Sequence, residues 1–181
     1  PMRTPFIAAN WKMHKTVHEA VVFIKELRSL IKDVADVEVV VAPPFTALHA
    51  CGEAARNTVI GIAAQNVYWE RDGAFTGEIS AAMVKEAGGE YVIIGHSERR
   101  QFFYETDDTV NRRLRAVLAS TLEWGARLAR VGAGARALGL WATLFADGAA
   151  AVSLQEGGGA FGRGDTELFA DAGLGLAVRG M

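Results

Sequence analysis

The ten residues YVIIGHSERR, positions 91–100, decide the fold class. Four consecutive apolar residues are typical of a strand buried on both faces, and a glycine ends the run. Polar side chains follow at once, in the order His96, Ser97 and Glu98. In parallel α/β folds, ligands bind at the carboxyl ends of the strands. This stretch therefore predicts a buried parallel strand with candidate site residues at its end.

The same strand-then-helix pattern repeats outward from this stretch. Short apolar or β-branched runs predict strands at 6–10, 38–42, 61–65 and 91–95. Apolar residues at helical spacing predict helices at 17–31, 46–55, 81–87 and 110–119. We expect Thr46 to cap the second helix and Asp107 or Asp108 to open the fourth. Four such units in succession predict an α/β protein with a parallel sheet covered by helices.

Composition and charge narrow the function class. The chain has 181 residues, half of them apolar, which is enough for a hydrophobic core. Its 19 basic and 21 acidic residues lack the positive excess that nucleic-acid or membrane-surface binding needs. The single cysteine, Cys51, excludes an intramolecular disulfide. Because the sequence has neither a bilayer-length apolar run nor a signal-peptide pattern, we expect a cytoplasmic protein without membrane or nucleic-acid partners.

The composition changes abruptly after Ala119. Every lysine, histidine, proline and isoleucine lies in 1–119, whereas Gly and Ala supply 27 of the 62 residues in 120–181. We therefore predict one domain over 1–119 and a Gly/Ala-rich segment over 120–181 whose apolar runs would complete the sheet. Two other interpretations stay open. The segment would be an out-of-frame or scrambled continuation, or the first part would pair with a second copy of the chain.

Two candidate site residues follow predicted strands. Lys12 follows the first strand, where an ammonium group can hold an anionic substrate and stabilise developing negative charge. Taken alone, a solvated surface lysine is the more common case. A neutral His96 can donate to a carbonyl oxygen and move protons near pH 7. Ser97 and Glu98 would open a helical turn there, and a capping pair beside a satisfied histidine explains this spacing equally well.

Two other groups of residues have plain structural explanations. His14 and His18 stand four apart, as a metal pair on a helix would, but no third ligand lies nearby. We predict no metal site there. Arg112, Arg113 and Arg115 predict a solvated helix face, because no stacking aromatic residues interleave with them.

The loop at 72–78, DGAFTGE, has two interpretations. Phe75 lies between glycines at 73 and 77, and it either folds back on its own domain or reaches into a partner. An apolar side chain at a glycine-flanked loop tip favours the partner.

Several segments in order resemble one known family. They are AANWKMH (8–14), APPFTAL (42–48), AQNVYWERDGAFTGEISAAMVKEAG (64–88), YVIIGHSERRQFF (91–103) and ETDDTVNRRLRAVLAS (105–120). Residues 3–118 resemble the N-terminal half of the triosephosphate isomerase family. The resemblance implies that 1–119 is the N-terminal half of a TIM-type (β/α) barrel, with the remainder truncated or aberrant.

The resemblance also implies roles for individual residues. Lys12, with Asn10 beside it, would bind substrate and neutralise its phosphate and the developing enediolate. His96 would polarise the substrate carbonyl, and this family is itself the standard example of a neutral histidine in that role. Ser97 would be a substrate-binding residue that also shapes the turn around His96. Glu98 would be a catalytic residue, the acidic neighbour of the lysine and the histidine. No cofactor or metal is implied.

A homodimer is implied by the same resemblance. The loop around Thr76 would insert into the second subunit near Lys12. The interface residues would be Met13, His14, Gln65, Phe75, Thr76 and Glu78. Glu105 would be a structural, ion-pairing position.

The implied activity is interconversion of dihydroxyacetone phosphate and glyceraldehyde 3-phosphate through an enediolate, in glycolysis and gluconeogenesis. The family's catalytic base follows its sixth strand in a Glu-Pro-Val-Trp motif, and no proline occurs here after Pro44. The alternative is therefore an inactive truncated relative that serves only as a folded, phosphate-binding or interacting module.

Overall fold

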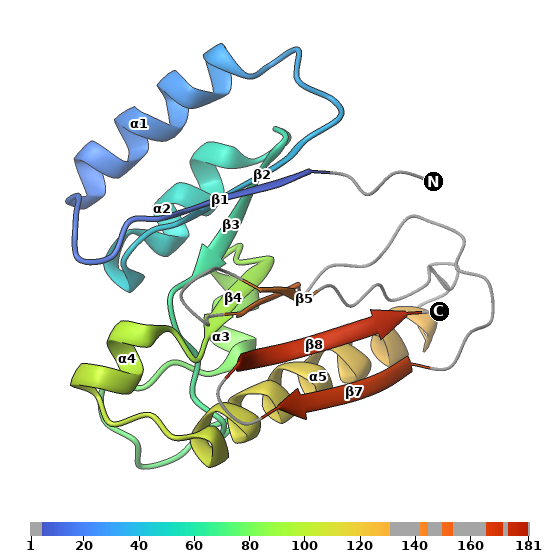
Figure 1. Ribbon diagram of the computed structural model, residues 1–181. Helices are drawn as coiled ribbons and strands as arrows, with labels where there is room; N and C mark the ends of the chain where they lie inside the picture. Colours follow the sequence, from blue (N-terminus) through green and yellow to red (C-terminus); the bar gives the residue numbers. More distant parts are fainter. Residues whose placement is uncertain (1–4, 131–141, 145–149, 154–165, 172–173, 181) are drawn as a thin grey trace. The chain divides into compact units, whose positions relative to one another are not determined.

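Three parallel strands begin the sheet. The computed structural model describes residues 5–130, 142–144, 150–153, 166–171 and 174–180. Strand β1 (Phe6–Asn10) pairs in parallel with β2 (Glu38–Ala42), which pairs in parallel with β3 (Ile60–Ala64) (Figure 1). The register sets Asn10 opposite Ala42, so the carboxyl ends of β1 and β2 are level. The predicted bounds of β1 and β2 are confirmed, and β3 lies one residue earlier than predicted.

The chain forms two compact units. The first unit holds the chain up to Gln65 together with Met83–Tyr91. The second unit holds Asn66–Ala82 together with the chain from Val92 onward. The strands β1 to β3 therefore belong to the first unit.

Helix α1 (Val17–Leu30) follows β1 and starts with a capping box. The hydroxyl of Thr16 accepts a hydrogen bond from the backbone N–H of Glu19, and the Glu19 carboxylate accepts one from the N–H of Thr16. These two bonds satisfy backbone donors that a helix start leaves open. The Glu19 carboxylate accepts from both the N–H and the hydroxyl of Thr16, and these two bonds hold the pKa of Glu19 below its usual value.

Helix α2 (Phe45–Ala55) begins one residue earlier than predicted. Pro44 is its cap residue, and its carbonyl accepts from the N–H of Ala47. The expectation that Thr46 caps this helix is therefore wrong, because Thr46 already lies inside a helix that begins at Phe45. Helix α3 (Ala81–Glu86) follows later in the chain and ends one residue earlier than predicted.

The core of the first unit lies between its strands and helices. Ile24 of α1, Val41 of β2, Cys51 of α2 and Ile62 of β3 are each almost completely buried. Burying an aliphatic side chain of this size stabilises a fold by about 1.5–3 kcal/mol. Burial also raises the pKa of the Cys51 thiol to about 11.

The Tyr91 ring packs against Gly61, a position where a side chain would not fit. A Cβ atom on Gly61 would lie 2.7 Å from the Tyr91 ring and 3.2 Å from a methyl group of Val40. The Tyr91 hydroxyl donates to the Glu38 carboxylate, and the ring meets the edge of Phe6 at a centroid distance of 5.8 Å. The missing side chain at Gly61 therefore makes room for a ring that joins β1, β2 and β3.

The second unit contains most of the helices after β3. Strand β4 (Tyr91–Ile94), which continues into this unit from Val92, is buried at every position. Helix α4 (Ser97–Phe102) follows it, and helix α5 (Asp107–Arg130) follows α4. As predicted, α5 begins at Asp107, but the capping hydroxyl is that of Thr106, which accepts from the N–H of Thr109 at 3.4 Å. The helix also continues eleven residues past the predicted end at Ala119.

Four short strands follow α5 in the described part of the chain. Strand β5 (Ala142–Leu144) pairs antiparallel with β6 (Ala150–Ser153). Strand β7 (Thr166–Asp171) pairs antiparallel with β8 (Leu174–Gly180), and the two lie side by side in Figure 1. The strands of a β/α barrel pair in parallel, so these pairings are of a different kind. That 120–181 completes a shortened barrel stays a prediction.

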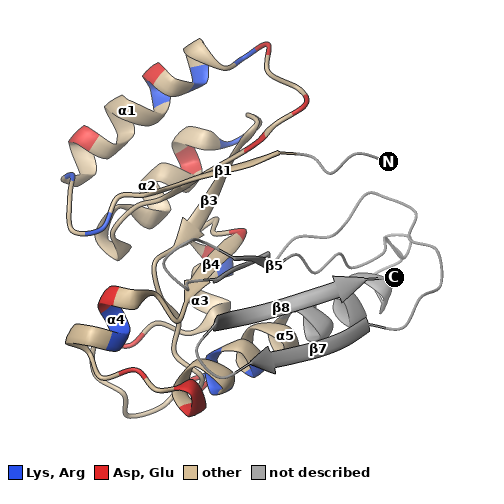
Figure 2. Cartoon of the chain, in the orientation of Figure 1, with Lys and Arg blue, Asp and Glu red and all other residues tan. Residues whose placement is uncertain are grey.

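Charge on helix α1 is mixed. Figure 2 shows acidic and basic residues interspersed along it. Among the described residues, no helix is both long enough and apolar enough to span a bilayer.

Gly61→Ala is expected to lower the free energy of unfolding by about 1–3 kcal/mol, because the added methyl overlaps the Tyr91 ring. Urea denaturation followed by circular dichroism measures the loss. The matched double variant Gly61→Ala with Tyr91→Leu removes the overlap. It should lose less than the sum of the two single variants. Additive losses would contradict the steric explanation.

The Cys51 thiol is expected to react slowly with Ellman's reagent in the native chain and rapidly in guanidinium chloride. Burial blocks access, and a pKa of about 11 leaves on the order of one thiol in a thousand ionised at about pH 8. Because this pKa exceeds the ordinary value of 9.0, stability that depends on the neutral thiol is present below pH 9 and is lost as the pH rises toward 11. Rapid reaction of the native chain would contradict the buried position.

Candidate functional site

Lys12 lies in a loop that is tied to the ends of two strands. The Asn10 side-chain oxygen accepts from the Lys12 N–H at 3.0 Å. The Gln65 amide donates to the Lys12 carbonyl at 2.9 Å and to the Ala42 carbonyl at 2.8 Å. The N–H of Trp11 also donates to Ala42 at 3.1 Å. Three of the predicted site residues, Asn10, Lys12 and Gln65, are therefore brought together within the first unit.

The backbone of this loop is strained. Lys12 has φ +52° and Lys15 has φ +74°, in the left-handed region that side chains with a Cβ disfavour. Such a residue costs of order 1–3 kcal/mol and persists where surrounding bonds hold it. The Lys15 ammonium lies over the rings of Phe23 and Trp11, at 4.7 and 5.5 Å from their centroids. The loop thus holds Lys12 in one backbone conformation.

Met13 and His14 lie on the outer side of the same loop. Both side chains are exposed, and Met13 is 93% exposed. An apolar side chain this exposed carries an area that association with a partner would bury. Their predicted role in a dimer interface stays a prediction.

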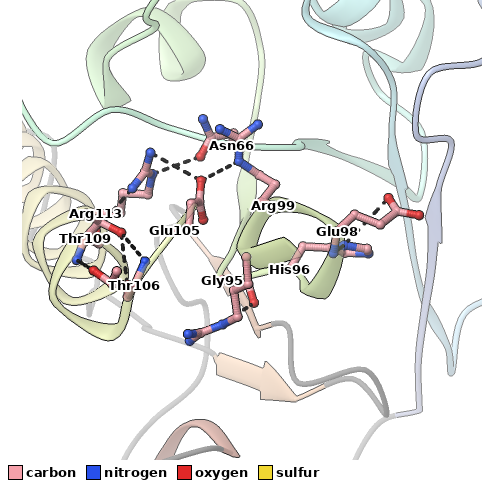
Figure 3. Close-up of polar contacts among 10 residues, drawn as sticks. Asn66, Gly95, His96, Glu98, Arg99, Glu105, Thr106, Thr109 and Arg113 are labelled. Atoms are coloured by element: carbon pink, nitrogen blue, oxygen red, sulfur yellow. Dashed lines mark hydrogen bonds and ion pairs between the residues drawn. The ribbon is translucent and has the colours of Figure 1, made fainter. Parts of the chain in front are cut away.

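His96 is the cap residue of α4. Its Nδ1 accepts a hydrogen bond from the backbone N–H of Glu98 at 3.2 Å (Figure 3). An accepting Nδ1 carries no proton, so in the neutral ring the proton is on Nε2. The Glu98 carboxylate lies 3.8 Å from the same Nδ1. The imidazole is 8% exposed.

The predicted helical turn after the fourth strand is confirmed. It begins at Ser97, and the capping group is the imidazole of His96 rather than a Ser–Glu pair. His96, Ser97 and Glu98 are thus brought together at the start of α4, within the second unit.

Arg100 holds the turn that carries His96. Its Nε donates to the Gly95 carbonyl at 3.1 Å, and another nitrogen donates to the Asp107 carboxylate at 2.7 Å. Gly95 has φ +69°, and a Cβ there would approach the Val110 methyl groups to 3.2 Å. A glycine is therefore required directly before His96, both for the backbone conformation and for the space.

A buried carboxylate joins α4 to α5. Glu105 accepts from Arg99 and pairs with Arg113 at 3.3 Å (Figure 3). Arg113 also donates to the Asn66 side chain at 3.0 Å and to the Thr109 carbonyl at 3.3 Å. The side chains of Glu105 and Arg113 are 3% and 5% exposed. Burial lowers the pKa of Arg113, and the charge of Glu105 opposes that shift.

Arg113 corrects the expectation of a solvated arginine face. Arg112 pairs with Asp108 at 2.9 Å, and Arg115 bonds to Asn111 at 2.7 Å. Both arginines are exposed, as predicted. Arg113 instead is buried. The signal was its helical spacing from Val110 and Val117, which places it on the apolar face of α5.

The loop that carries Thr76 is exposed over residues 70–78. Phe75 is 39% exposed, and its ring packs on Tyr68 of the same loop at a centroid distance of 4.9 Å. Thr76 and Glu78 are exposed. Part of Phe75 therefore folds back, while the tip stays accessible to a partner.

Comparisons with known proteins show the family of this chain. The family model described as triosephosphate isomerase matches residues 5–124. The chain belongs to the triosephosphate isomerase family. The matched segment includes the Lys12 loop, the Thr76 loop and the His96 turn, and it ends inside α5.

The relatives are about twice as long as the matched part. The chain is 54% identical to triosephosphate isomerase of Trichlorobacter lovleyi over 121 residues, which are 67% of this chain and 48% of the relative. It is 54% identical to that of Pelobacter propionicus over 118 residues, 65% of this chain and 47% of the relative. The chain thus spans about half the length of the curated relatives it matches.

A solved structure shows the same fold. The triosephosphate isomerase of Bartonella henselae superposes with a TM-score of 0.59 and 37% identity, over 63% of this chain and 47% of that chain. The four N-terminal β/α units of this chain are therefore those of a TIM-type barrel.

Glu105→Gln is expected to lower the free energy of unfolding by about 3–5 kcal/mol, because it leaves a buried guanidinium without its counter-charge. Glu53→Gln is the matched control. Glu53 pairs with Arg56 at the surface, where an ion pair contributes at most about 1 kcal/mol. Urea denaturation of both variants measures the difference, and equal losses would contradict a special role for the buried cluster.

Proposed function

We propose that this chain acts as a triosephosphate isomerase, interconverting dihydroxyacetone phosphate and glyceraldehyde 3-phosphate through an enediolate in glycolysis and gluconeogenesis. The reaction needs no cofactor or metal, and the proposed location is the cytoplasm. The observation that carries this proposal is the His96 turn. Its Nδ1 accepts from the Glu98 N–H, so in the neutral ring the proton is on Nε2.

The proposed chemistry assigns a role to each residue. Nε2–H of His96 would donate to the substrate carbonyl oxygen, where negative charge develops when a proton leaves the adjacent carbon. The Lys12 ammonium would neutralise the phosphate and the enediolate, and Asn10 holds the Lys12 backbone. Ser97 and Glu98 would set the turn around the imidazole. These assignments rest on family membership and on the local geometry of each unit.

One observation favours a second candidate function. No proline occurs after Pro44, so the family's Glu-Pro-Val-Trp motif with its catalytic base is absent from this sequence. Loss of a positioned general base costs roughly 10²–10⁴-fold in rate. The alternative is a relative without catalysis that binds a phosphate ester or serves as an interaction module.

We also propose a homodimer formed through the loop around Thr76. The exposed Phe75, Thr76 and Glu78 on one loop and the exposed Met13 and His14 on another support this proposal. In the proposed dimer, the Thr76 loop of one copy would lie near Lys12 of the other. The Gln65 amide, which binds the Lys12 carbonyl, would support that contact from within its own unit.

A coupled isomerase assay on the purified chain tests the activity. Turnover is expected in the wild-type chain and should fall roughly 10²-fold or more in Lys12→Ala, because an ammonium that stabilises developing charge is removed. Lys32→Ala removes an exposed lysine outside the site and is expected to leave turnover unchanged.

The Lys12→Ala variant also controls for traces of a host enzyme. Equal signal in the wild-type and Lys12→Ala chains, or none in either, would contradict the enzymatic proposal and favour the binding or interaction module.

A further inference from the structure

The loop that carries Thr76 has an exposed tip and an anchored base. Residues 70–78 are all exposed, whereas Asn66, Val67 and Ser80 at its two ends are buried. The N–H of Tyr68 donates to the Ile79 carbonyl at 2.8 Å, which closes the neck of the loop. The base is therefore fixed to the second unit, and the tip projects from it.

Trp69 forms the contact between the base of the loop and α5. Its ring lies 4.9 Å from the Arg113 guanidinium and 5.6 Å from that of Arg112. Arg113 also binds Asn66 at 3.0 Å, so this arginine holds the loop at two points. A guanidinium over an indole ring is the strongest of the common cation–π pairs, and it is stronger when partly desolvated, as Arg113 is.

Aromatic rings carry this contact from the base to the tip. Trp69 packs on Tyr68 with a centroid distance of 4.1 Å, and Tyr68 packs on Phe75 at 4.9 Å. Two backbone bonds, from Phe75 to Gly73 and from Glu78 to Phe75, turn the chain at the tip. The rings of Trp69, Tyr68 and Phe75 thus form a continuous row from the base of the loop to its exposed tip.

A loop that is already held in one conformation associates more tightly with a partner than a flexible loop does. Fixing the backbone of each loop residue costs about 1–2 kcal/mol in conformational entropy. A loop already held in one conformation does not lose that entropy again when it meets a partner, so association is tighter.

We infer that Trp69 is a positioning residue that orders the tip of the Thr76 loop for contact with a second copy of the chain. Arg113 and Arg112 hold Trp69, and Tyr68 transmits its position to Phe75. The inference rests on the proposed homodimer for its partner. The ordering of the loop itself rests only on contacts within the second unit.

Cleavage by trypsin measures the order of the tip, because Arg71 lies in it. Trp69→Leu in the full chain is expected to raise the rate of cleavage after Arg71 roughly tenfold, with the far-UV circular dichroism spectrum unchanged. Trp69→Phe keeps a ring beneath the guanidinium groups and should restore a rate close to wild type. Arg113 is not substituted, because its loss would also break the buried pair with Glu105.

A second aromatic–arginine pair provides the matched control. Phe103 stacks on Arg99 at 4.6 Å and lies outside the loop. Phe103→Leu should leave cleavage after Arg71 unchanged. Cleavage of Trp69→Leu at the wild-type rate, or an equal increase in Phe103→Leu, would overturn the ordering role of Trp69.

Sedimentation equilibrium then tests the partner. The wild-type chain is expected to dimerise. Trp69→Leu should raise the dissociation constant of the dimer roughly tenfold, whereas Trp69→Phe should leave it close to the wild-type value. A wild-type dimer with unchanged affinity in Trp69→Leu would overturn this inference and leave the proposed dimer standing. A monomeric wild-type chain would overturn the proposed dimer and the partner named here, and the trypsin rates would still decide the ordering of the loop.

Discussion

The negative charge of Glu105 is shared by two arginines from different helices. Arg99 belongs to α4, which starts at the His96 turn, and Arg113 belongs to α5. Because Glu105 and Arg113 are nearly free of solvent, loss of Glu105 leaves the Arg113 guanidinium buried without a counter-charge. Through Arg113 the same cluster reaches Asn66 and Trp69 at the base of the Thr76 loop. One carboxylate therefore holds the histidine turn, the long helix and the exposed loop in a fixed arrangement.

In the first unit, the loop that carries Lys12 is held by neutral hydrogen bonds and not by a buried ion pair. The neutral amide of Gln65 uses its two N–H groups on the carbonyls of Lys12 and Ala42. Asn10 accepts from the Lys12 backbone, which sits in a left-handed conformation. Neutral hydrogen bonds suffice here because the loop is exposed, and the lysine ammonium does not have to be taken out of water. The two units thus present their candidate site residues by different physical means.

Much of the fold could be predicted from local patterns. The strands at 6–10 and 38–42 have the predicted bounds, because alternating or β-branched runs between helices act within a few residues. Helix starts were predicted less well. Pro44 rather than Thr46 is the cap residue of α2, and Thr106 supplies the hydroxyl that caps α5. Several candidate capping residues stand within one turn of each helix start, and the backbone geometry decides among them. The end of α5 at Arg130 lies eleven residues beyond the predicted end at Ala119.

The sequence by itself determined the order of the β/α units, the family, and the positions of Lys12 and His96 just after two strands of the sheet. Periodicity and motif spacing are local properties, so one chain suffices to read them. Only the tertiary structure decided that Arg113 is buried, that Gly61 makes room for Tyr91, and that Nδ1 of His96 accepts and leaves the proton on Nε2. Each of these depends on a partner brought close by folding, such as Asn66, 47 residues from Arg113. Charge, space and hydrogen-bond direction are set by the neighbours in space, and a sequence pattern does not contain them.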